Sequence, residues 1–294
     1  SLRRAFIFLI SLYSNNDPRD IQLILSPNLS HKYIVRSSKI EGVWKDEEIG
    51  SWQPFNLKRN SNFCIQILTT EACYMMAVNG YHFAEYAHRL PHKLVNCIDV
   101  KGDVEQVHAT ISYVESYPER FSEMKVIRSV GAINSENGDC TLSSERTQLS
   151  LPYYGRLSRG TLTNGRYLKI EGYVKMLPIF FFIKLQKGRD VWPQPLVAFH
   201  FNPRYSEKHA GLKSVIVCNA WRDRLLQESR FMLHRQLLPM NNFSLLIVCG
   251  AHAYEVYLNG ERIVHFTYQV DPSIADTVYI HGDIKLRSVL VGQN

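Results

Sequence analysis

The sequence predicts an all-β protein built from two β-sandwich domains. Three observations support this fold class: apolar segments of strand length alternate with polar residues, helical periodicity is scarce, and features of the first half recur in the second half. The chain has 294 residues, of which 45% are hydrophobic and 21% charged, which is typical of a globular protein. This length suffices for two domains that each bury a core.

The first half reads as a series of short strands. The apolar run at 5–12 follows Arg3 and Arg4, but it is short and no small-residue cleavage site follows it, so we expect a buried strand and not a signal peptide. The apolar segment 74–78 leads directly into Asn79-Gly80, the dipeptide most typical of a tight hairpin turn. These patterns favour a sandwich of antiparallel strands.

An internal repeat relates the two halves. Asn79-Gly80 recurs as Asn259-Gly260, and Gly102-Asp103 recurs as Gly282-Asp283, both displaced by 180 positions. Between the halves lies a polar stretch rich in Glu, Ser, Asn and Arg, which is typical of a linker. We therefore predict a first domain at 1–114, a linker at 115–148 and a second domain at 149–294.

The second half contains a candidate binding site on three nearby segments. Together they supply one imidazole, two carboxamides, two guanidiniums and one carboxylate, without an evident nucleophile. Such directional donors and acceptors suit a neutral, hydroxyl-rich ligand. Each segment alone is more typical of a strand end or a solvated edge strand than of a site, but the three in this order predict a site. The residues are His200, Asn202, Arg204, Asn219, Glu228 and Arg230.

At these residues the chain resembles a known family. His-x-Asn-x-Arg at 200–204, Val-x-Asn at 217–219 and Glu-x-Arg at 228–230 resemble the carbohydrate-recognition domain of galectins, the β-galactoside-binding lectins. The resemblance extends to an opening strand near 151–153 and a closing strand near 280–284. It implies two jelly-roll β-sandwich domains of the galectin type.

The resemblance also assigns roles to the site residues. It implies that His200, Asn202 and Arg204 hold the axial 4-hydroxyl of galactose, and that Asn219 and Glu228 hold the 6-hydroxyl. Arg230 would orient Glu228 and reach the neighbouring sugar. Two guanidiniums beside one carboxylate keep that carboxylate ionised and fixed in direction.

One position of the second domain departs from the family pattern. Leu225 stands where the family has a Trp that stacks on the galactose ring, and Trp221 lies four residues before it. Aromatic stacking contributes about 0.5–1.5 kcal/mol beyond area burial, so we expect weakened binding.

The first half departs in the opposite way. Trp44 and Glu47 match the family's Trp and Glu, but 24–28 reads Ile-Leu-Ser-Pro-Asn, Ser37 replaces the Asn, and Ile49 replaces the last Arg. We expect no ordinary galactose binding there and a partly buried, structural Trp44. No opening Leu-Pro-Tyr strand precedes the first inner strand, so this domain is predicted to be incomplete at its start, with an unpaired sheet edge.

Three functions compete. The first is a lectin that binds β-galactoside glycans or glycoproteins through the C-terminal domain. The second is a galectin-fold interaction module that has largely lost sugar binding, with a protein partner on the N-terminal domain. The third is a glycosidase, which needs two carboxylates across the scissile bond. It is disfavoured because Glu228 lies between two arginines and its only nearby companions are Asp223 and Glu207.

Composition excludes further classes. The net charge of +7 is modest, and no Lys/Arg cluster is interleaved with aromatics, so nucleic acid is not an expected partner. No segment approaches membrane-spanning length, and neither the cysteines nor the histidines have metal-type spacing, so we expect no membrane insertion, metal or cofactor. Cys64, Cys218 and Cys249 lie in apolar runs and are predicted to be buried free thiols. The run 180–182 is predicted to be core. The galectin resemblance implies a cytoplasmic protein that reaches the cell exterior by an unconventional route.

Overall fold

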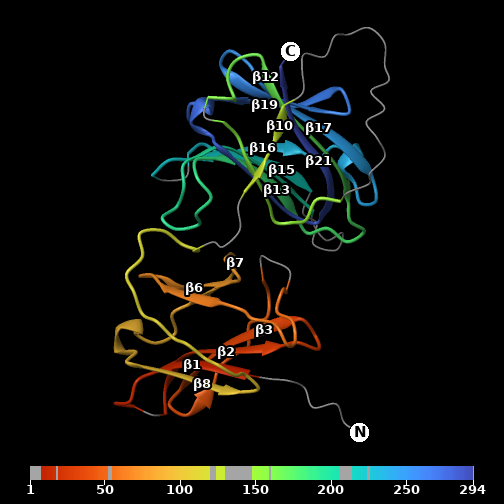
Figure 1. The fold of residues 1–294 in the computed structure, drawn as a ribbon. Coiled ribbons are helices and arrows are strands. Elements are labelled where there is room, and N and C mark those ends of the chain that lie inside the picture. The colour runs from red at the N-terminus through yellow and green to blue at the C-terminus, as the bar shows by residue number, and fades with distance from the viewer. Residues whose placement is uncertain are drawn as a thin grey trace. The chain divides into compact units, whose positions relative to one another are not determined.

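The computed structural model describes residues 8–17, 19–51, 55–119, 124–129, 148–158, 160–205, 214–223 and 226–293. Within these ranges the chain is all-β, and its helical elements are three single 3-10 turns. The chain divides into two compact units, residues 1–122 and 123–294 (Figure 1). The prediction of an all-β chain with two sandwich domains is confirmed.

The first unit consists of a five-stranded and a three-stranded antiparallel sheet. The larger sheet has the order β4 (Val43–Trp44), β3 (Tyr33–Ile40), β2 (Ile21–Asn28), β1 (Phe8–Tyr13) and β8 (Cys97–Gly102). The smaller sheet has the order β5 (Ile65–Thr69), β6 (Cys73–Val78) and β7 (Tyr81–Ala87). The described part of the apolar run, residues 8–12, lies in β1, as predicted.

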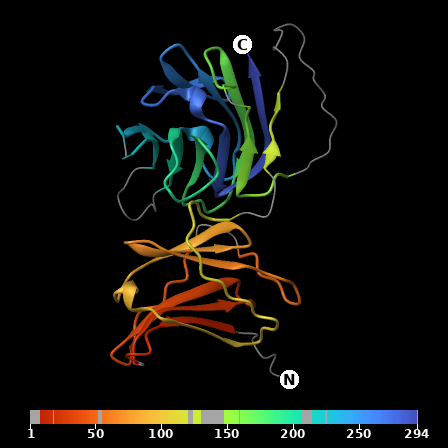
Figure 2. The same ribbon diagram turned by 60° about the vertical axis from the view of Figure 1, so that its left-hand side comes forward.

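The second unit has two larger sheets, which Figure 2 shows as layers. The seven-stranded sheet has the order β16 (Ser229–Met232), β15 (Val215–Trp221), β14 (Val197–Arg204), β13 (Phe181–Gln186), β20 (Thr277–Gly282), β11 (Tyr153–Arg156) and β9 (Lys125–Val126). The six-stranded sheet has the order β10 (Arg128–Ser129), β21 (Ile284–Gln293), β12 (Arg166–Val174), β17 (Asn242–Cys249), β18 (Ala253–Leu258) and β19 (Glu261–Thr267).

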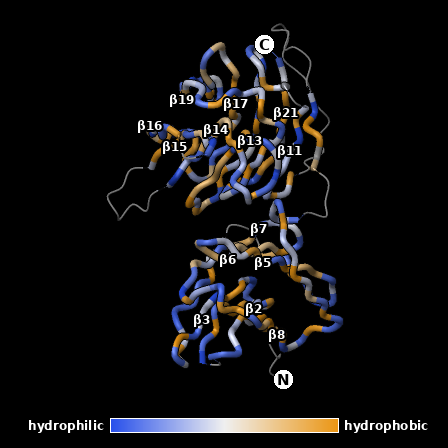
Figure 3. Tube along the Cα trace, turned by 90° about the vertical axis from the view of Figure 1, so that its left-hand side faces the viewer, coloured by the Kyte–Doolittle hydropathy of each residue, from blue (hydrophilic) through white to orange (hydrophobic). Residues whose placement is uncertain are grey.

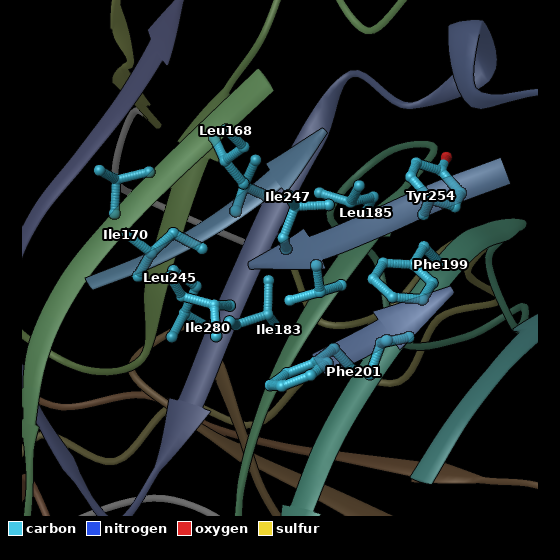
Figure 4. Close-up of a cluster of buried hydrophobic side chains, with 14 of the residues drawn as sticks. Leu168, Ile170, Ile183, Leu185, Phe199, Phe201, Leu245, Ile247, Tyr254 and Ile280 are labelled. Atoms are coloured by element: carbon cyan, nitrogen blue, oxygen red, sulfur yellow. The ribbon is translucent and has the colours of Figure 1, made fainter. Parts of the chain in front are cut away.

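The core of the second unit lies between its two sheets. Successive side chains of a strand point to opposite faces of its sheet. On β14 the rings of Phe199 and Phe201 are fully buried, and on β17 Leu245 and Ile247 are buried in the same way. Figure 4 shows these side chains meeting those of neighbouring strands, and Figure 3 shows hydrophobic positions interspersed with hydrophilic ones along the strands. The alternate residues of β14, His200 and Asn202, point to the other face of the seven-stranded sheet.

The internal repeat has a structural counterpart. Asn79 and Asn259 each have a positive φ, 52° and 46°, and each is followed by a glycine that also has a positive φ. The Asn79 side chain accepts a hydrogen bond from the backbone N–H of Cys64, and the Asn259 side chain accepts one from that of Ser244, at 2.9 and 2.8 Å. The Asn-Gly turns therefore close equivalent hairpins in the two units.

The two units differ in the strands that complete them. Within the described ranges the first unit has no strand that corresponds to β11, β12 or β21, and β5 forms the edge of its sheet. In the second unit the corresponding strand β17 pairs with β12. An edge strand exposes unpaired backbone groups.

Parts of the stretch predicted as a linker are buried or form strands. Tyr117 is buried within the first unit, where its hydroxyl lies 3.2 Å from Nδ1 of His82. Strands β9 and β10 pair in parallel with β11 and β21 in the second unit. Residues 130–147 lie outside the described part of the chain.

At Gly282 both backbone strain and crowding oppose a side chain. Its φ is 117°, and an added Cβ would lie 2.4 Å from Cα of Phe181. We expect Gly282→Ala to lower the stability of the second domain by about 3 kcal/mol, because strain and overpacking add. In calorimetry of the full chain this corresponds to a fall of roughly 6–12 °C in one transition.

The matched control is Gly188→Ala. Gly188 also has a positive φ, 74°, but nothing lies within 4 Å of its added Cβ. We expect a loss of only about 1–2 kcal/mol from backbone strain. Equal losses for the two variants would contradict the role of crowding at Gly282.

Candidate functional site

The predicted site residues come together on one face of the seven-stranded sheet. His200 on β14 lies directly opposite Asn219 on β15, and Asn202 lies opposite Val217. Val217 in turn lies opposite Arg230 on β16. Directly opposed residues share a face, so all the predicted segments present their polar groups on the side away from the core.

His200 is held by Asn219. Its Nδ1 lies 3.1 Å from Oδ1 of Asn219, so the tautomer that makes this bond carries its proton on Nδ1. Burial, together with the positive charge of Lys184, lowers the pKa of His200 to about 3. The ring is therefore neutral at physiological pH. Its buried Nε2 has no hydrogen-bond partner among the described residues and is an unused acceptor.

Asn202 and Arg204 form a second fixed pair. Nδ2 of Asn202, which is 5% exposed, donates to the backbone carbonyl of Phe181 at 2.7 Å. Nε of Arg204 donates to Oδ1 of Asn202, also at 2.7 Å. The guanidinium of the exposed Arg204 is thus oriented through its Nε.

Glu228 and Arg230 form the third pair. Nε of Arg230 donates to Oε1 of Glu228 at 2.8 Å, and the Glu228 side chain is 27% exposed. The other carboxylate oxygen remains an acceptor. On the neighbouring strand β15, Oδ1 of Asn219 is used by His200, and its Nδ2 is a further donor.

These pairs create two places that suit a hydroxyl group. A hydroxyl donates one hydrogen bond and accepts others. Near β14 it can donate to Nε2 of His200 and accept from Arg204. Near β16 it can donate to Glu228 and accept from Nδ2 of Asn219. The arrangement is suited to hold a polyhydroxylated ring and contains no activated nucleophile.

The apolar contact for such a ring is less defined. Leu225, which replaces the family's Trp, lies outside the described residues. Trp221 is half-buried at the end of β15, two residues beyond Asn219 and therefore on the same side of the strand.

Four residues of this face were not predicted as part of it. Phe182 packs edge-on against His200, Tyr279 and His281, with ring centroids 5.0–5.8 Å apart, and Lys184 lies opposite His200. Of the run 180–182 predicted to be core, Phe181 and Phe182 are buried and Phe180 is half-buried, but only Phe181 belongs to the hydrophobic cluster between the sheets. Strand alternation within 181–186 was the signal available.

The corresponding face of the first unit lacks the polar set. Ile24 lies opposite Ser37, as His200 lies opposite Asn219, and the Ser37 hydroxyl donates to the carbonyl of Lys45 at 2.8 Å. Trp44 is 51% exposed, with Nζ of Lys39 5.7 Å from its ring centroid. The expectation of a partly buried, structural Trp44 is therefore wrong.

Other expectations concern metals, thiols and membranes. The described residues contain no group of three or more His, Cys, Asp or Glu side chains arranged to hold a metal. Cys218 and Cys249 are buried free thiols, as predicted, whereas Cys64 is only half-buried. None of the described helices has the length and apolar character required to cross a bilayer.

A β-sandwich whose sheet face carries donors and acceptors for hydroxyl groups is typical of a class of carbohydrate-binding proteins. Comparison with known proteins identifies the family within this class. The model of the galactoside-binding lectin family matches residues 4–110 and 152–291. The chain therefore belongs to this family, the galectins, with two domains in tandem.

The relatives include Galectin-4 of Homo sapiens and a 32 kDa beta-galactoside-binding lectin of Caenorhabditis elegans. Each is 26% identical over 97% of this chain and 86% of its own length. Galectin-8 of Rattus norvegicus is 27% identical over 87% of this chain and 76% of its own length.

The lowered pKa of His200 predicts acid sensitivity. In the unfolded chain a His titrates near pH 6.5. Below that pH the unfolded state therefore binds a proton that the folded state does not bind. The resulting loss in the free energy of unfolding is absent above pH 6.5. It grows as the pH falls toward 3, by at most about 1.4 kcal/mol per pH unit. Denaturant unfolding at pH 7, 6 and 5 should show this slope.

His200→Gln should reduce the dependence of the free energy of unfolding of the second domain on pH. His252→Gln, at an exposed position, should not reduce it. His281, whose pKa burial lowers to about 4, keeps a residual slope in both variants. Identical pH dependence in wild type and His200→Gln would contradict the burial of a neutral imidazole.

Proposed function

We propose that the second domain binds β-galactosides, through His200, Asn202, Arg204, Asn219, Glu228 and Arg230. The observation that carries this proposal is the neutral His200, on the strand that also bears Arg204: its buried Nε2 has no hydrogen-bond partner among the described residues. Together they match the donor and the acceptor of one hydroxyl. The 4-hydroxyl of galactose is assigned to this place, and the 6-hydroxyl to Asn219 and Glu228.

Binding in the first domain would require different chemistry. Its strand β2 offers Ile24 and Ser26 where β14 offers His200 and Asn202, and the hydroxyl of Ser37 is used by a backbone carbonyl. We propose that this domain does not bind galactose in the manner of the second.

The second candidate function is a protein-interaction module. Exposed apolar side chains of the first unit favour it: Val43, Trp44 and Ile49 are each 51–60% exposed. A surface of this kind suits a protein partner on the N-terminal domain. The two functions are compatible, since they use different domains.

Catalysis is not part of the proposal. A glycosidase needs two carboxyl groups across the scissile bond. Glu228 is engaged by Arg230, Asp223 is exposed beyond the end of β15, and Glu207 lies outside the described residues. Family membership supports a binding protein that acts in the cytoplasm and, after unconventional secretion, outside the cell.

Removal of one charged side chain from the proposed sugar site tests the proposal. Arg204→Ala and Glu228→Gln should each weaken lactose binding about tenfold or more, because hydrogen bonds to charged groups contribute about 1.5–3 kcal/mol and tenfold corresponds to 1.4 kcal/mol. The measurement is calorimetric or NMR titration of the full chain with lactose.

The control is Arg262→Ala, since Arg262 pairs with Glu255 on the opposite sheet. It should leave lactose affinity unchanged. Absence of chemical-shift changes near His200 and Glu228 at very high lactose concentration would refute the proposal and favour the interaction module.

A further inference from the structure

The loop between β12 and β13 of the second domain presents apolar side chains to solvent. Met176, Leu177 and Ile179 are 64%, 87% and 70% exposed, with Pro178 among them. A single exposed apolar side chain is ordinary on a protein surface. Three within four consecutive residues, at this exposure, indicate an interaction site.

A second pair of exposed apolar side chains lies at the same end of the domain. Tyr205 connects the two segments, because its backbone N–H donates to the carbonyl of Ile179 and its hydroxyl donates to the carbonyl of Leu237. Leu238 and Met240, which follow Leu237, are 47% and 53% exposed. We call the five exposed side chains the apolar tip: Met176, Leu177, Ile179, Leu238 and Met240.

Asp283 holds the loop in a fixed shape. Its Oδ2 accepts a hydrogen bond from the backbone N–H of Ile179 at 2.9 Å, and its Oδ1 lies 3.8 Å from Nζ of Lys175. Its carbonyl accepts a further bond from the backbone N–H of Lys175 at 3.0 Å. Both ends of the loop are thus tied to the residue that precedes β21. The apolar tip therefore loses little conformational entropy when it meets a partner.

Exposed basic residues lie beside the apolar tip. Lys175 precedes Met176 directly, and Arg235 opens the 3-10 turn Arg235–Leu237, which leads to Leu238. Lys285 on β21 lies opposite Tyr173, whose hydroxyl is 2.8 Å from Sδ of Met240.

Two described acids of this region already have partners. Asp283 is engaged as above, and Oε2 of Glu261 lies 3.1 Å from Nε2 of His234. The apolar tip with its basic neighbours is complementary to an anionic bilayer, which has negative headgroups above an apolar interior.

We propose that the apolar tip docks the second domain on a bilayer that contains anionic phospholipid. Met176, Leu177 and Ile179 enter the boundary between headgroups and acyl chains, while Lys175, Arg235 and Lys285 face the lipid phosphates. Such docking is peripheral, since side chains enter the interface and no segment crosses the bilayer. A protein partner would need a recess that matches the projecting loop, whereas a fluid interface accommodates it without one.

Vesicle binding tests the proposal. The full chain is sedimented with vesicles of phosphatidylcholine alone and with vesicles that also contain phosphatidylserine. We expect at least about tenfold tighter binding to the anionic vesicles, weakened by added salt. The double variant Leu177→Gln/Ile179→Gln should lose about tenfold or more of this affinity, because two apolar side chains no longer enter the interface.

Three controls separate this contact from other binding. Val126→Gln replaces an apolar residue that is 76% exposed on β9 of the same domain, and it should leave vesicle binding unchanged. Lys285→Gln should weaken binding to the anionic vesicles by about fivefold and binding to neutral vesicles not at all. Lactose should not displace the chain, since these vesicles carry no sugar, so the result does not depend on the proposed function.

A tryptophan placed in the loop reports whether it enters the lipid. The emission of Leu177→Trp, after subtraction of the wild type with its four tryptophans, should shift to shorter wavelength on anionic vesicles. Brominated acyl chains should quench it. Val126→Trp should show neither effect.

The remaining outcomes would overturn the proposal. Absence of binding to anionic vesicles, equal binding to both kinds of vesicle, or equal binding of the wild type and the double variant would each do so. Self-association that the double variant abolishes, without vesicle binding, would instead assign the apolar tip to a contact between copies of the chain.

Discussion

The alternation of strand β14 is the constraint on which the site depends. Phe199 and Phe201 are fully buried between the sheets, and Phe199 stacks on Tyr254 of the opposite sheet at 4.6 Å. This anchoring fixes which face each residue of the strand takes, so His200, Asn202 and Arg204 must point away from the core. A slip of one residue would exchange the two sets, at the cost of burying charge in place of aromatic surface. The core of the second domain therefore determines the geometry of its binding face.

The polar face is in turn organised by hydrogen bonds that leave few groups free. Asn202 is satisfied by the carbonyl of Phe181 and by Arg204, and His200 is satisfied on one side by Asn219. Buried polar atoms without partners are costly, so the exceptions are informative. Among the described residues Nε2 of His200 is such an exception, and a hydroxyl that donates to it would supply the missing partner.

The sequence contained the six polar residues and their order, and this was enough to predict that they share one site. Period-two alternation placed them on one side of each strand, and the family resemblance related the strands to one another. Phe182 and Lys184 were missed as part of the face because a run of three aromatics does not show which ring points inward. Their placement depends on pairing with β20, almost one hundred residues later in the chain, and the register of that pairing is not encoded locally. The exposure of Trp44 was missed for the same reason, since it depends on how little of the chain covers β4.

A comparison of the two domains shows why the fold can persist where the site does not. The turn at Asn79 and its counterpart at Asn259 make the same hydrogen bonds, and Gly102 and Gly282 share a positive φ near 110–120°. These groups lie at hairpin turns and strand ends and not on β2, so substitutions on β2 leave the backbone constraints intact. The replacements at Ile24 and Ser37 are uncharged and small enough for the same pairing between β2 and β3. Because the outer face of a sheet contributes little to the core, its side chains are free to change, and the two domains are thereby able to acquire different partners.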